Sequence, residues 1–399
     1  MKIVFLTQYY PPETGAAQRR LSGLAARMVV RGHDVTVLTA MPSYPRGKIY
    51  PGYGGTVQRE EIDGVKIIHT LIYPTQKADY VRRLTNYFSF MVSSSIVGAL
   101  LLERPDYLIV ESPPLFLGLT GFALSRLKRA RMIFNVSDLW PESAVSLGIL
   151  KRESLAYRLS QKLEEFCYRH AWLVTGQARG ILDDISRRYP EVPTYFLSNG
   201  VDTARYDVHP GKAGGKGDCN VLYAGLHGLA QGLDQVVDAA AIVRESGGCR
   251  FLLIGDGPEK EALRDRALSL KLPNITFGDS LPSGEVPALV SSADIVLVTL
   301  KLYIPGAVPS KLYEAMAASR PVVLVADGEA ADIVRTHRAG LVVKPGDTRE
   351  LARSICLLRD QPELRREMGA NGRRAAVEFF DSARIADHYI DHLEECRRP

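Results

Sequence analysis

Residues 305–326 read PGAVPSKLYEAMAASRPVVLVA, which predicts a loop, a short helix and a buried strand in succession. Pro309 and Ser310 are typical of a helix start, and Lys311 adds positive charge where backbone N–H groups lack partners. The apolar residues of this helix fall on one face, namely Leu312, Ala315 and Met316. Glu314 is then on the opposite side. The stretch is consistent with an anion-binding helix N-terminus beside a carboxylate that binds hydroxyl groups. It is equally consistent with an ordinary capped helix whose glutamate is solvated.

The alternation of buried strands with helices continues through both halves of the chain. The predicted strands are 2–7, 34–39, 65–70, 107–111, 131–136 and 172–176, then 220–224, 250–255, 274–278, 294–298, 321–326 and 340–343. Continuous Val, Ile and Leu runs of this kind indicate parallel, doubly wound α/β sheets. A chain of 399 residues is too long for one compact core, and residues 209–218 are typical of a linker. We therefore expect two Rossmann-like domains, 1–205 and 219–378, facing one cleft.

The composition disfavours several classes of protein. A hydrophobic content of 46% with 24% charged residues is typical of a folded chain. Five cysteines without a CxxC pair argue against a zinc site and for a reducing compartment. The linker does not match a P-loop, and no GxGxxG follows the first strand, which disfavours nucleoside triphosphatases and dinucleotide oxidoreductases. The first residues also lack the pattern of a secretory signal.

Positive charge is concentrated in the first half of the chain. Residues 1–200 contain 25 Lys and Arg against 17 Asp and Glu, a balance of +8, whereas residues 201–399 have a balance of −3. A basic half predicts an anionic partner such as a lipid headgroup, a pyrophosphate or a nucleic acid. Nucleic acid is the weakest of these, because no basic helix with interleaved aromatic residues is present.

Residues 84–102 bear on membrane association. They carry no charge over 19 residues and follow Arg82 and Arg83. Three interpretations remain open: a buried crossover helix of the α/β domain, a helix that dips into the bilayer interface, and a transmembrane span diluted by serines.

Two loops of the first domain follow strands, at the edge of an open α/β sheet where ligands bind. The first, residues 8–17, contains Gly15, which allows close approach of a ligand ahead of the next helix. The second, residues 137–143, places Asp138 beside Trp140, a pairing suited to binding or activating an acceptor. Glu142 in that loop is a weaker candidate, since it also fits a helix N-terminal charge.

Two loops of the second domain have the corresponding position. Residues 225–234 (GLHGLAQGLD) carry three glycines between a strand and a helix, which suits a loop wrapped on a phosphate or pyrophosphate. Residues 255–258 (GDGP) follow the next strand and could line a nucleoside pocket.

In this order and spacing, the motifs resemble those of one known family. The glycine loop after the first strand, Asn199-Gly-Val-Asp, Tyr223-Ala-Gly, Gly255-Asp-Gly-Pro and Glu314-Ala-Met are similar to the retaining GT-B glycosyltransferases of family GT4. The stretches DLWPES, GLAQG and VPSKLYE resemble enzymes of bacterial O-antigen and capsule assembly, a group that includes L-fucosamine transferases. The resemblance covers almost the whole chain.

The resemblance implies roles for individual residues. Glu314 would hold the donor ribose, the backbone around Ser310 and Lys311 would cradle the diphosphate, and Asp138 would face the transferred sugar and acceptor. The implied donor-binding residues are Gly15, Gly225, His227, Gln231, Gly255, Asp256, Pro309, Ser310, Lys311 and Glu314. The implied acceptor-binding residues are Asp138, Trp140 and Glu142, and the implied catalytic residues are Asp138, Lys311 and Glu314. A terminal helix, 381–396, would pack back on the first domain.

The chain departs from the family pattern at three positions. Gly306 stands where the family has the first glutamate of its E-x7-E motif, and His227 and Gln231 lie where an Arg and a Lys usually clamp the diphosphate. Another cation must then neutralise the leaving group. Lys311 is the first candidate, and Arg187 or Arg188 is the second.

The resemblance therefore implies a retaining transferase that needs no metal and no cofactor. It would move a sugar from a nucleotide diphosphate, UDP rather than GDP, to a polyprenyl-diphosphate-linked or growing saccharide. We expect it in the cytoplasm, peripheral on the anionic inner face of the membrane. The alternatives are a UDP-sugar 2-epimerase of the same fold and a non-catalytic relative that binds sugar nucleotides.

Overall fold

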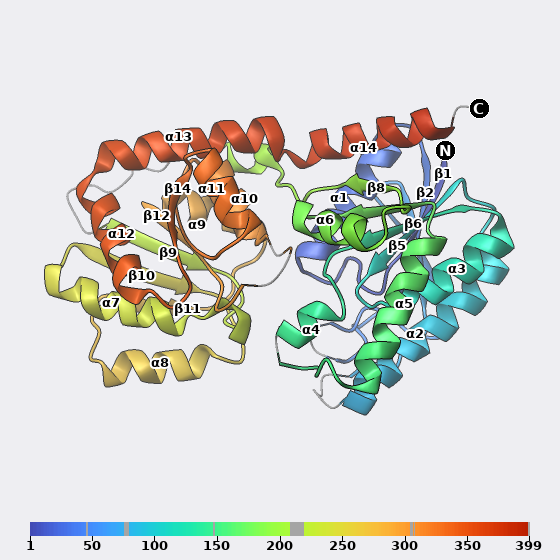
Figure 1. Ribbon diagram of the computed structural model, residues 1–399, viewed down its shortest axis with the longest axis horizontal. Coiled ribbons are helices and arrows are strands. Elements are labelled where there is room, and N and C mark those ends of the chain that lie inside the picture. The colour runs from blue at the N-terminus through green and yellow to red at the C-terminus, as the bar shows by residue number, and fades with distance from the viewer. Residues whose placement is uncertain are drawn as a thin grey trace. The chain divides into compact units, whose positions relative to one another are not determined.

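A computed structural model describes residues 1–44, 47–75, 80–146, 148–207, 219–303, 306 and 308–397 (Figure 1). It divides into two compact units, one made of Met1–Asn199 and Ser382–Pro399 and the other of Gly200–Asp381. Residues 200–207 thus lie with the second unit: Arg373 donates to the carbonyl of Thr203 at 2.9 Å, and Arg205 to that of Ser283 at 2.6 Å. This boundary falls a few residues before the expected one, and the expected linker 209–218 lies outside the described residues.

The first unit is built on an eight-stranded sheet in the order β3-β4-β2-β1-β5-β6-β7-β8. The strands are β1 (Lys2–Leu6), β2 (Asp34–Ala40), β3 (Val57–Ile62), β4 (Val65–Thr70), β5 (Tyr107–Ser112), β6 (Arg131–Val136), β7 (Leu173–Gly176) and β8 (Thr194–Phe196). Every pairing is parallel except that of β3 with β4. The central strands are buried along their length, as expected for a sheet covered on both faces.

Strands β3 and β8 were not predicted from the sequence. β3 (VQREEI) is polar and mostly exposed at the sheet edge, so it lacks the apolar run that marks the inner strands. Its turn does have a sequence signal: Asp63 and Gly64 both have positive φ and join Ile62 to Val65 in a two-residue hairpin. β8 has only three residues, too few for a periodic pattern.

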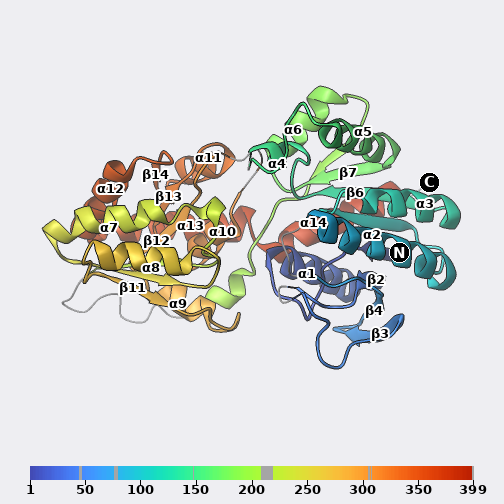
Figure 2. The same cartoon turned by 90° about the horizontal axis from the view of Figure 1, so that it is seen from below.

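Helices cover both faces of this sheet (Figures 1 and 2). They are α1 (Ala16–Val30), α2 (Tyr80–Leu101), α3 (Leu117–Lys128), α4 (Glu142–Ser146), α5 (Leu155–His170), α6 (Arg179–Arg188) and α14 (Ser382–Arg397). α1 and α14 share one core with the sheet, and α14 contributes Tyr389, Ile390 and Leu393 to it. α2 and α3 pack beside each other on the opposite face, where Gly98 of α2 lies against Leu38 of β2 and Leu124 of α3.

The segment 84–102 falls within α2, which connects β4 to β5 as a crossover helix. Of the three interpretations, the crossover helix has the right place in the chain, but it is not a buried one, because only 22% of its most apolar 18-residue window is buried. By length and composition alone, Arg82–Leu101 could cross a membrane, and it is the one such helix in the described part of the chain. Its inner side nevertheless packs on the sheet, with Phe90 and Ser94 fully buried.

The second unit has a six-stranded parallel sheet in the order β11-β10-β9-β12-β13-β14. The strands are β9 (Cys219–Ala224), β10 (Cys249–Ile254), β11 (Ile275–Gly278), β12 (Ile295–Thr299), β13 (Val322–Val325) and β14 (Gly340–Val343). The helical elements are η1 (Thr203–Tyr206), η2 (Leu229–Gln231), α7 (Asp234–Ser246), α8 (Lys260–Ser269), α9 (Val286–Ser292), α10 (Ser310–Ala317), α11 (Glu329–Thr336), α12 (Thr348–Asp360) and α13 (Pro362–Phe379). Two doubly wound α/β sheets confirm the predicted fold class.

The strand order of the second unit reverses at β9, which pairs with β10 on one side and β12 on the other. In open parallel sheets, this reversal leaves a crevice at the carboxyl ends of the strands, and ligands bind there. The loops after β9, β10 and β12 all start at that edge, so the topology brings the predicted donor-binding segments together.

Candidate active site

Helix α10 presents three polar positions and buries the rest. Leu312, Tyr313, Ala315, Met316 and Ala317 are buried, whereas Ser310, Lys311 and Glu314 are partly exposed. Residues three and four apart share a side of a helix, so Glu314 lies on the same side as both Lys311 and Ser310, at the accessible face of α10. Pro309 occupies the N-cap position, and no side chain of the described residues caps this end. The first-turn N–H groups and Lys311 thus form a positive end at the edge of the sheet.

Lys311 reaches from α10 to the end of strand β9. Its Nζ lies 5.3 Å from the centre of the Tyr223 ring, in a cation–π contact. A Cβ on Gly225 would overlap the Lys311 side chain, and Gly225 has a φ of 150°. Glycine is therefore needed here for two reasons, the backbone conformation and the space that the lysine occupies.

The loops after β9 and β10 are bonded to each other. The N–H of His227 donates to the carbonyl of Asp256 at 2.8 Å, and the N–H of Glu259 donates to the carbonyl of His227 at 3.0 Å. A Cβ on Gly255 would overlap the carbonyl oxygen of Gly225. The glycines predicted to cradle a ligand thus also let two loop backbones pack directly together, which fixes the shape of the edge.

His227 and Gln231 occupy the places of the expected diphosphate clamp. The His227 ring is fully buried, and neither of its nitrogens has a hydrogen-bond partner among the described residues. Burial lowers the pKa of His227, and the positive charge of Lys260 lowers it further. The neutral imidazole is therefore favoured, which argues against His227 as the missing cation. Gln231 folds its side-chain oxygen towards Gly228 and brings no charge.

Gly306, the position of the missing glutamate, has a φ of 73°. L-residues with side chains rarely adopt this left-handed conformation, so a glutamate could not replace Gly306 without strain. The backbone conformation at position 306 thus favours the glycine that this chain has in place of the family's glutamate.

In the first unit, a buried polar network lies at the carboxyl ends of β5, β6 and β7. Glu111 accepts from Arg20 at 2.7 Å, from Asn135 at 2.7 Å and from Ser137. Thr175 donates to Asn135 at 2.7 Å, and Gln177 donates to Ser137. The network joins α1 to three strands of the sheet. Sequence reasoning missed both Arg20 and Glu111.

Asp138 follows this network directly along the chain. Its side chain is exposed, yet desolvation raises its pKa and repulsion by Glu111 raises it further. A carboxyl group with a raised pKa accepts a proton more readily than an ordinary aspartate. Trp140 is half-buried, and its backbone N–H donates to the carbonyl of Asp138 at 2.9 Å. The loop therefore holds the aspartate and the tryptophan in a fixed turn.

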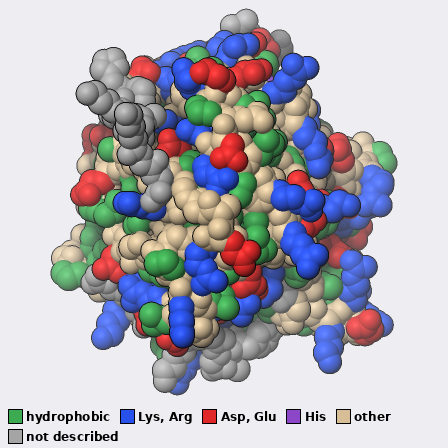
Figure 3. Space-filling view, turned by 90° about the vertical axis from the view of Figure 1, so that its left-hand side faces the viewer, with side chains coloured by type: hydrophobic (Ala, Val, Ile, Leu, Met, Phe, Trp, Pro, Cys, Tyr) green, Lys and Arg blue, Asp and Glu red, His purple; other side chains and the backbone are tan. Residues whose placement is uncertain are grey.

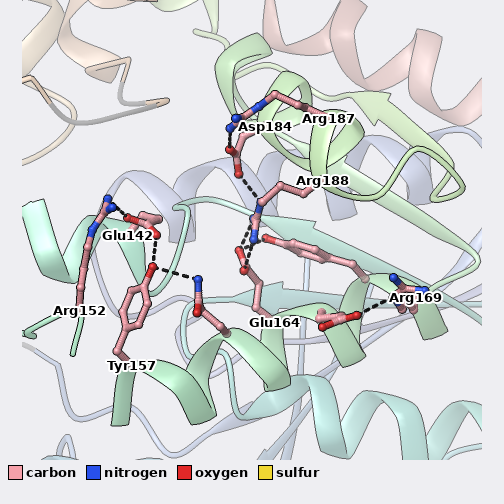
Figure 4. Close-up of polar contacts among 11 residues, drawn as sticks. Glu142, Arg152, Tyr157, Glu164, Arg169, Asp184, Arg187 and Arg188 are labelled. Atoms are coloured by element: carbon pink, nitrogen blue, oxygen red, sulfur yellow. Dashed lines mark hydrogen bonds and ion pairs between the residues drawn. The ribbon is translucent and has the colours of Figure 1, made fainter. Parts of the chain in front are cut away.

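Glu142 is engaged in contacts within the first unit (Figure 4). Its carboxylate accepts from the Tyr157 hydroxyl and from Arg152, the latter at 2.7 Å. It also opens helix α4, where a negative charge is favourable. This second interpretation of Glu142, as a helix N-terminal charge, is the one that the contacts favour.

Arg188, an alternative candidate for the diphosphate cation, is already paired with carboxylates of the first unit (Figure 4). Its guanidinium forms two hydrogen bonds to the buried Glu164, at 2.7 and 2.8 Å, and a third to Asp184 at 2.8 Å. Arg187 pairs with Asp184 at 2.5 Å. Since a bidentate pair is costly to break, Lys311 remains the better candidate.

The loop that contains Gly15 is held by a buried carboxylate that the sequence did not single out. Glu13 accepts from the N–H groups of Ser43 and Tyr44, at 2.7 and 2.8 Å, and so ties the loop after β1 to the loop after β2. Burial raises the pKa of Glu13 to about 7. Gly15 itself is extended, and a Cβ there would overlap the Gln18 side chain.

The structure therefore gathers the predicted residues in two sets, each at the carboxyl edge of its own sheet. The second unit holds Gly225, His227, Gln231, Gly255, Asp256, Pro309, Ser310, Lys311 and Glu314, and the first holds Gly15, Asp138, Trp140 and Glu142. Within the described residues, no group of three or more His, Cys, Asp or Glu could hold a metal ion.

Comparison with known families identifies the class of protein. Residues 15–200 match the glycosyl transferase 4-like domain, and residues 212–375 match the glycosyl transferases group 1 domain. The chain thus belongs to the group 1 glycosyltransferases and carries their two domains in the order of its two units.

Individual relatives agree with this assignment. WcaI of Escherichia coli K12, named as a colanic acid biosynthesis glycosyl transferase, is 26% identical over 344 residues, 82% of this chain and 84% of its own. Among solved structures, sucrose-phosphate synthase from Thermosynechococcus elongatus gives a TM-score of 0.79 at 17% identity, over 99% of this chain and 98% of its own. HepE of Anabaena, solved with UDP and glucose, gives 0.74 at 19% identity, over 99% of both chains. These neighbours show the same two-domain GT-B fold.

Proposed function

We propose that this protein is a retaining glycosyltransferase that transfers a sugar from a UDP-sugar to a lipid-linked or growing cell-surface saccharide. The observation that carries the proposal is the position of Lys311, at the uncapped start of α10 and against Gly225 of the glycine-rich loop. A cation, a helix N-terminus without a side-chain cap and a side-chain-free backbone together suit a diphosphate. Glu314, one turn further along α10, would accept hydrogen bonds from ribose hydroxyls.

Lys311 would act mainly on the leaving group. When the bond between the anomeric carbon and the diphosphate oxygen breaks, negative charge grows on that oxygen, and a fixed ammonium stabilises it. In retaining transfer, the acceptor hydroxyl attacks from the same face and its proton passes to the departing phosphate. The sugar thus forms a new bond to the acceptor oxygen, and the nucleotide diphosphate leaves protonated. No metal or cofactor is required in this scheme.

The first unit would bind the acceptor through the loop of Asp138 and Trp140. An aromatic ring beside a carboxylate can stack on a sugar and accept a hydrogen bond from one of its hydroxyls. The basic balance of residues 1–200 suits an acceptor that carries a diphosphate and an anionic membrane surface around it. We therefore propose a place on the inner face of the cell membrane, with a role in O-antigen, capsule or related polysaccharide assembly, as the name of WcaI also suggests.

UDP is the favoured nucleotide because HepE, which shares the fold, was solved with UDP and glucose. Hexosyl and N-acetylaminosugar donors, L-fucosamine derivatives included, fit the proposal equally. A thermal-shift panel of UDP- and GDP-sugars would choose among them. Product analysis with a polyprenyl-diphosphate saccharide, including the anomeric configuration by NMR, would then test transfer and retention.

The panel has outcomes that contradict the proposal. Absence of stabilisation by every sugar nucleotide would refute donor binding, and an inverted anomer would refute retention. Release of free UDP with an altered sugar, and without any acceptor, would favour a 2-epimerase.

Replacing Lys311 with alanine tests its role on the leaving group. We expect kcat to fall roughly 100-fold or more while the melting temperature stays unchanged, since the lysine is partly exposed. Lys271→Ala, at an exposed turn after α8, is the matched control and should leave kcat unaltered. Equal rates for both variants would exclude Lys311 as the neutralising cation.

A further inference from the structure

Helix α2 exposes large hydrophobic side chains at every fourth position of its outer side. These residues are Phe88, Val92, Ile96 and Leu100. Val92 is 53% exposed, Ile96 56% and Leu100 75%, so they are not edges of the core. A repeat of four keeps side chains on one side of a helix, and these four form a continuous stripe.

Helix α3 continues this stripe sideways. The two helices lie side by side in the same direction (Figures 1 and 2): Phe88 packs on Phe116, Ser95 bonds to Thr120 at 3.0 Å, and Lys128 donates to the carbonyl of Ala99 at 2.7 Å. α3 adds two exposed leucines, Leu119 and Leu127. The six side chains, Phe88, Val92, Ile96, Leu100, Leu119 and Leu127, are called the apolar strip below.

Every charged residue within α2 and α3 is basic, and the acidic residue that follows α2, Glu103, is paired with Lys2. Arg82 and Arg83 are exposed in the first turn of α2, and Arg126 and Arg129 are exposed at the end of α3. An uncharged apolar strip with arginines at its ends matches the layers of a bilayer surface, acyl chains below and anionic headgroups above.

The second unit has no comparable surface on the side seen in Figure 3. There, acidic and basic side chains alternate and hydrophobic ones are scattered. Its exposed hydrophobic residues come singly or in pairs, such as Leu268 and Leu270 at the end of α8, which is ordinary for a protein surface. The apolar strip is different because four of its members recur along one helix and the other two lie on the helix that packs beside it.

We propose that the apolar strip is the surface by which this protein docks on an anionic phospholipid bilayer. α2 would lie in the plane of the interface rather than span it, because its inner side, with Phe90 and Ser94, is buried against the sheet. This inference rests on the proposed function, for which a lipid-linked acceptor is the reason to be at a membrane.

Docking in this orientation would also place the acceptor. Asn86, in the first turns of α2, accepts from the Gln8 side chain at 2.7 Å and donates to the carbonyl of Tyr73 at 2.7 Å. The basic start of α2 is thereby joined to the loops after β1 and β4. Lipid headgroups held near Arg82 and Arg83 would lie at the same edge of the sheet as the loop that contains Gly15.

The test compares two double variants of the full chain. Ile96→Glu with Leu100→Glu places two charges in the apolar strip, and Val30→Glu with Leu268→Glu places two charges at other exposed aliphatic sites. Binding is measured by co-sedimentation with phosphatidylcholine vesicles, with and without phosphatidylglycerol. We expect the strip variant to lose vesicle binding roughly tenfold or more and the control to keep it. Arg82→Gln with Arg83→Gln should reduce only the preference for phosphatidylglycerol.

Several outcomes would overturn the docking proposal. One is recovery of the unaltered protein in the supernatant with both kinds of vesicle, and another is a strip variant that binds as well as the control. A dimer that the strip substitutions dissociate, without vesicle binding, would assign the strip to a second copy of the chain. Stabilisation by a UDP-sugar is measured on the same variants in solution, and it should be unchanged. Loss of docking is thus separable from failure of the glycosyltransferase proposal.

Discussion

At the scale of single residues, small side chains decide where the charged ones can lie. Lys311 occupies the space that a side chain on residue 225 would fill, and the loops after β9 and β10 meet where Gly255 has no Cβ. The position of Lys311 therefore depends on the absence of side chains at Gly225 and Gly255. A change at Gly225 should act on a ligand through Lys311.

Gly225→Ala is expected to weaken sugar-nucleotide binding roughly tenfold, because the new methyl group displaces the Lys311 ammonium. The φ of 150° adds backbone strain. Isothermal titration with the stabilising donor measures the effect. Gly284→Ala, at a site with open space around it, is the control and should bind normally. Unchanged affinity in Gly225→Ala would mean that Lys311 does not have to lie against residue 225 for the sugar nucleotide to bind.

Glu13 predicts a dependence of stability on pH. Its pKa is about 7 in the folded chain, against 4.5 for an ordinary glutamate, because burial disfavours the charged form. The folded state therefore binds the proton more tightly, and stability falls by about 3 kcal/mol as the pH rises from below 4.5 to above 7. Glu13→Gln keeps an acceptor for the N–H groups of Ser43 and Tyr44 and removes the charge, so this loss should disappear.

Urea unfolding at about pH 5 and about pH 8 measures this difference for the protein and the variant. Glu367→Gln, an exposed position on α13, should behave like the unaltered protein. If Glu13→Gln loses as much stability with rising pH as the unaltered protein does, Glu13 is not the responsible group.

The sequence revealed the glycines and the charged turn of α10 because they are local patterns. It did not reveal Arg20 and Glu111, which are 91 residues apart and are buried by pairing with each other. Taken separately, an arginine on a helix and a glutamate near the end of a strand resemble surface residues. Only the sheet brings them together, as it brings Glu13 to the loop after β2.

At the scale of elements, α10 is fixed by the helix that packs on it. α13 approaches so closely that a Cβ on Gly369 would overlap the carbonyl of Ser319, just past the end of α10, and one on Gly372 would lie 3.3 Å from the Cα of Met316. Glycines three residues apart thus form a flat side on α13. The position of Lys311 and Glu314 depends on this contact.

Gly369→Ala is expected to destabilise the second unit by about 1–3 kcal/mol, since backbone must move to admit the methyl group. Gly23→Ala on α1, also a helical glycine but with no atom nearby, should instead stabilise by about 0.5–1 kcal/mol. Thermal unfolding of both variants gives the comparison. A stabilised Gly369→Ala variant would show that α13 can shift without cost.

The elements that sequence patterns predicted were those with buried apolar runs. Twelve strands were expected and all twelve occur, whereas β3 and β8 were missed. β3 is polar on both faces, and its partner β4 supplies the pairing that its own residues do not indicate. For α2 the sequence left three interpretations open, because composition cannot tell which side of an apolar helix faces the core.

At the scale of the whole molecule, the chain returns to the first unit after it has formed the second. After α13, helix α14 belongs to the first unit, where Arg27 holds Asp387 through two hydrogen bonds of 2.8 and 2.5 Å. The Tyr107 hydroxyl donates to the carbonyl of Leu393 at 2.8 Å. The first unit is therefore incomplete without the last residues of the chain, although 182 residues of the second unit intervene.

Deleting residues 382–399 should unfold the first unit and leave the second folded. Tyr389, Ile390 and Leu393 are fully buried, and exposing their site costs about 5–9 kcal/mol, as much as the stability of many domains. The second unit has its own core around Val221, Phe251 and Val323, which the deletion does not touch. Calorimetry should then show one transition in place of two, and the one that remains should rise in temperature with the donor sugar nucleotide. His388→Ala, an exposed change on α14, should keep both transitions. Loss of both transitions in the truncated chain would show instead that the two units fold as one.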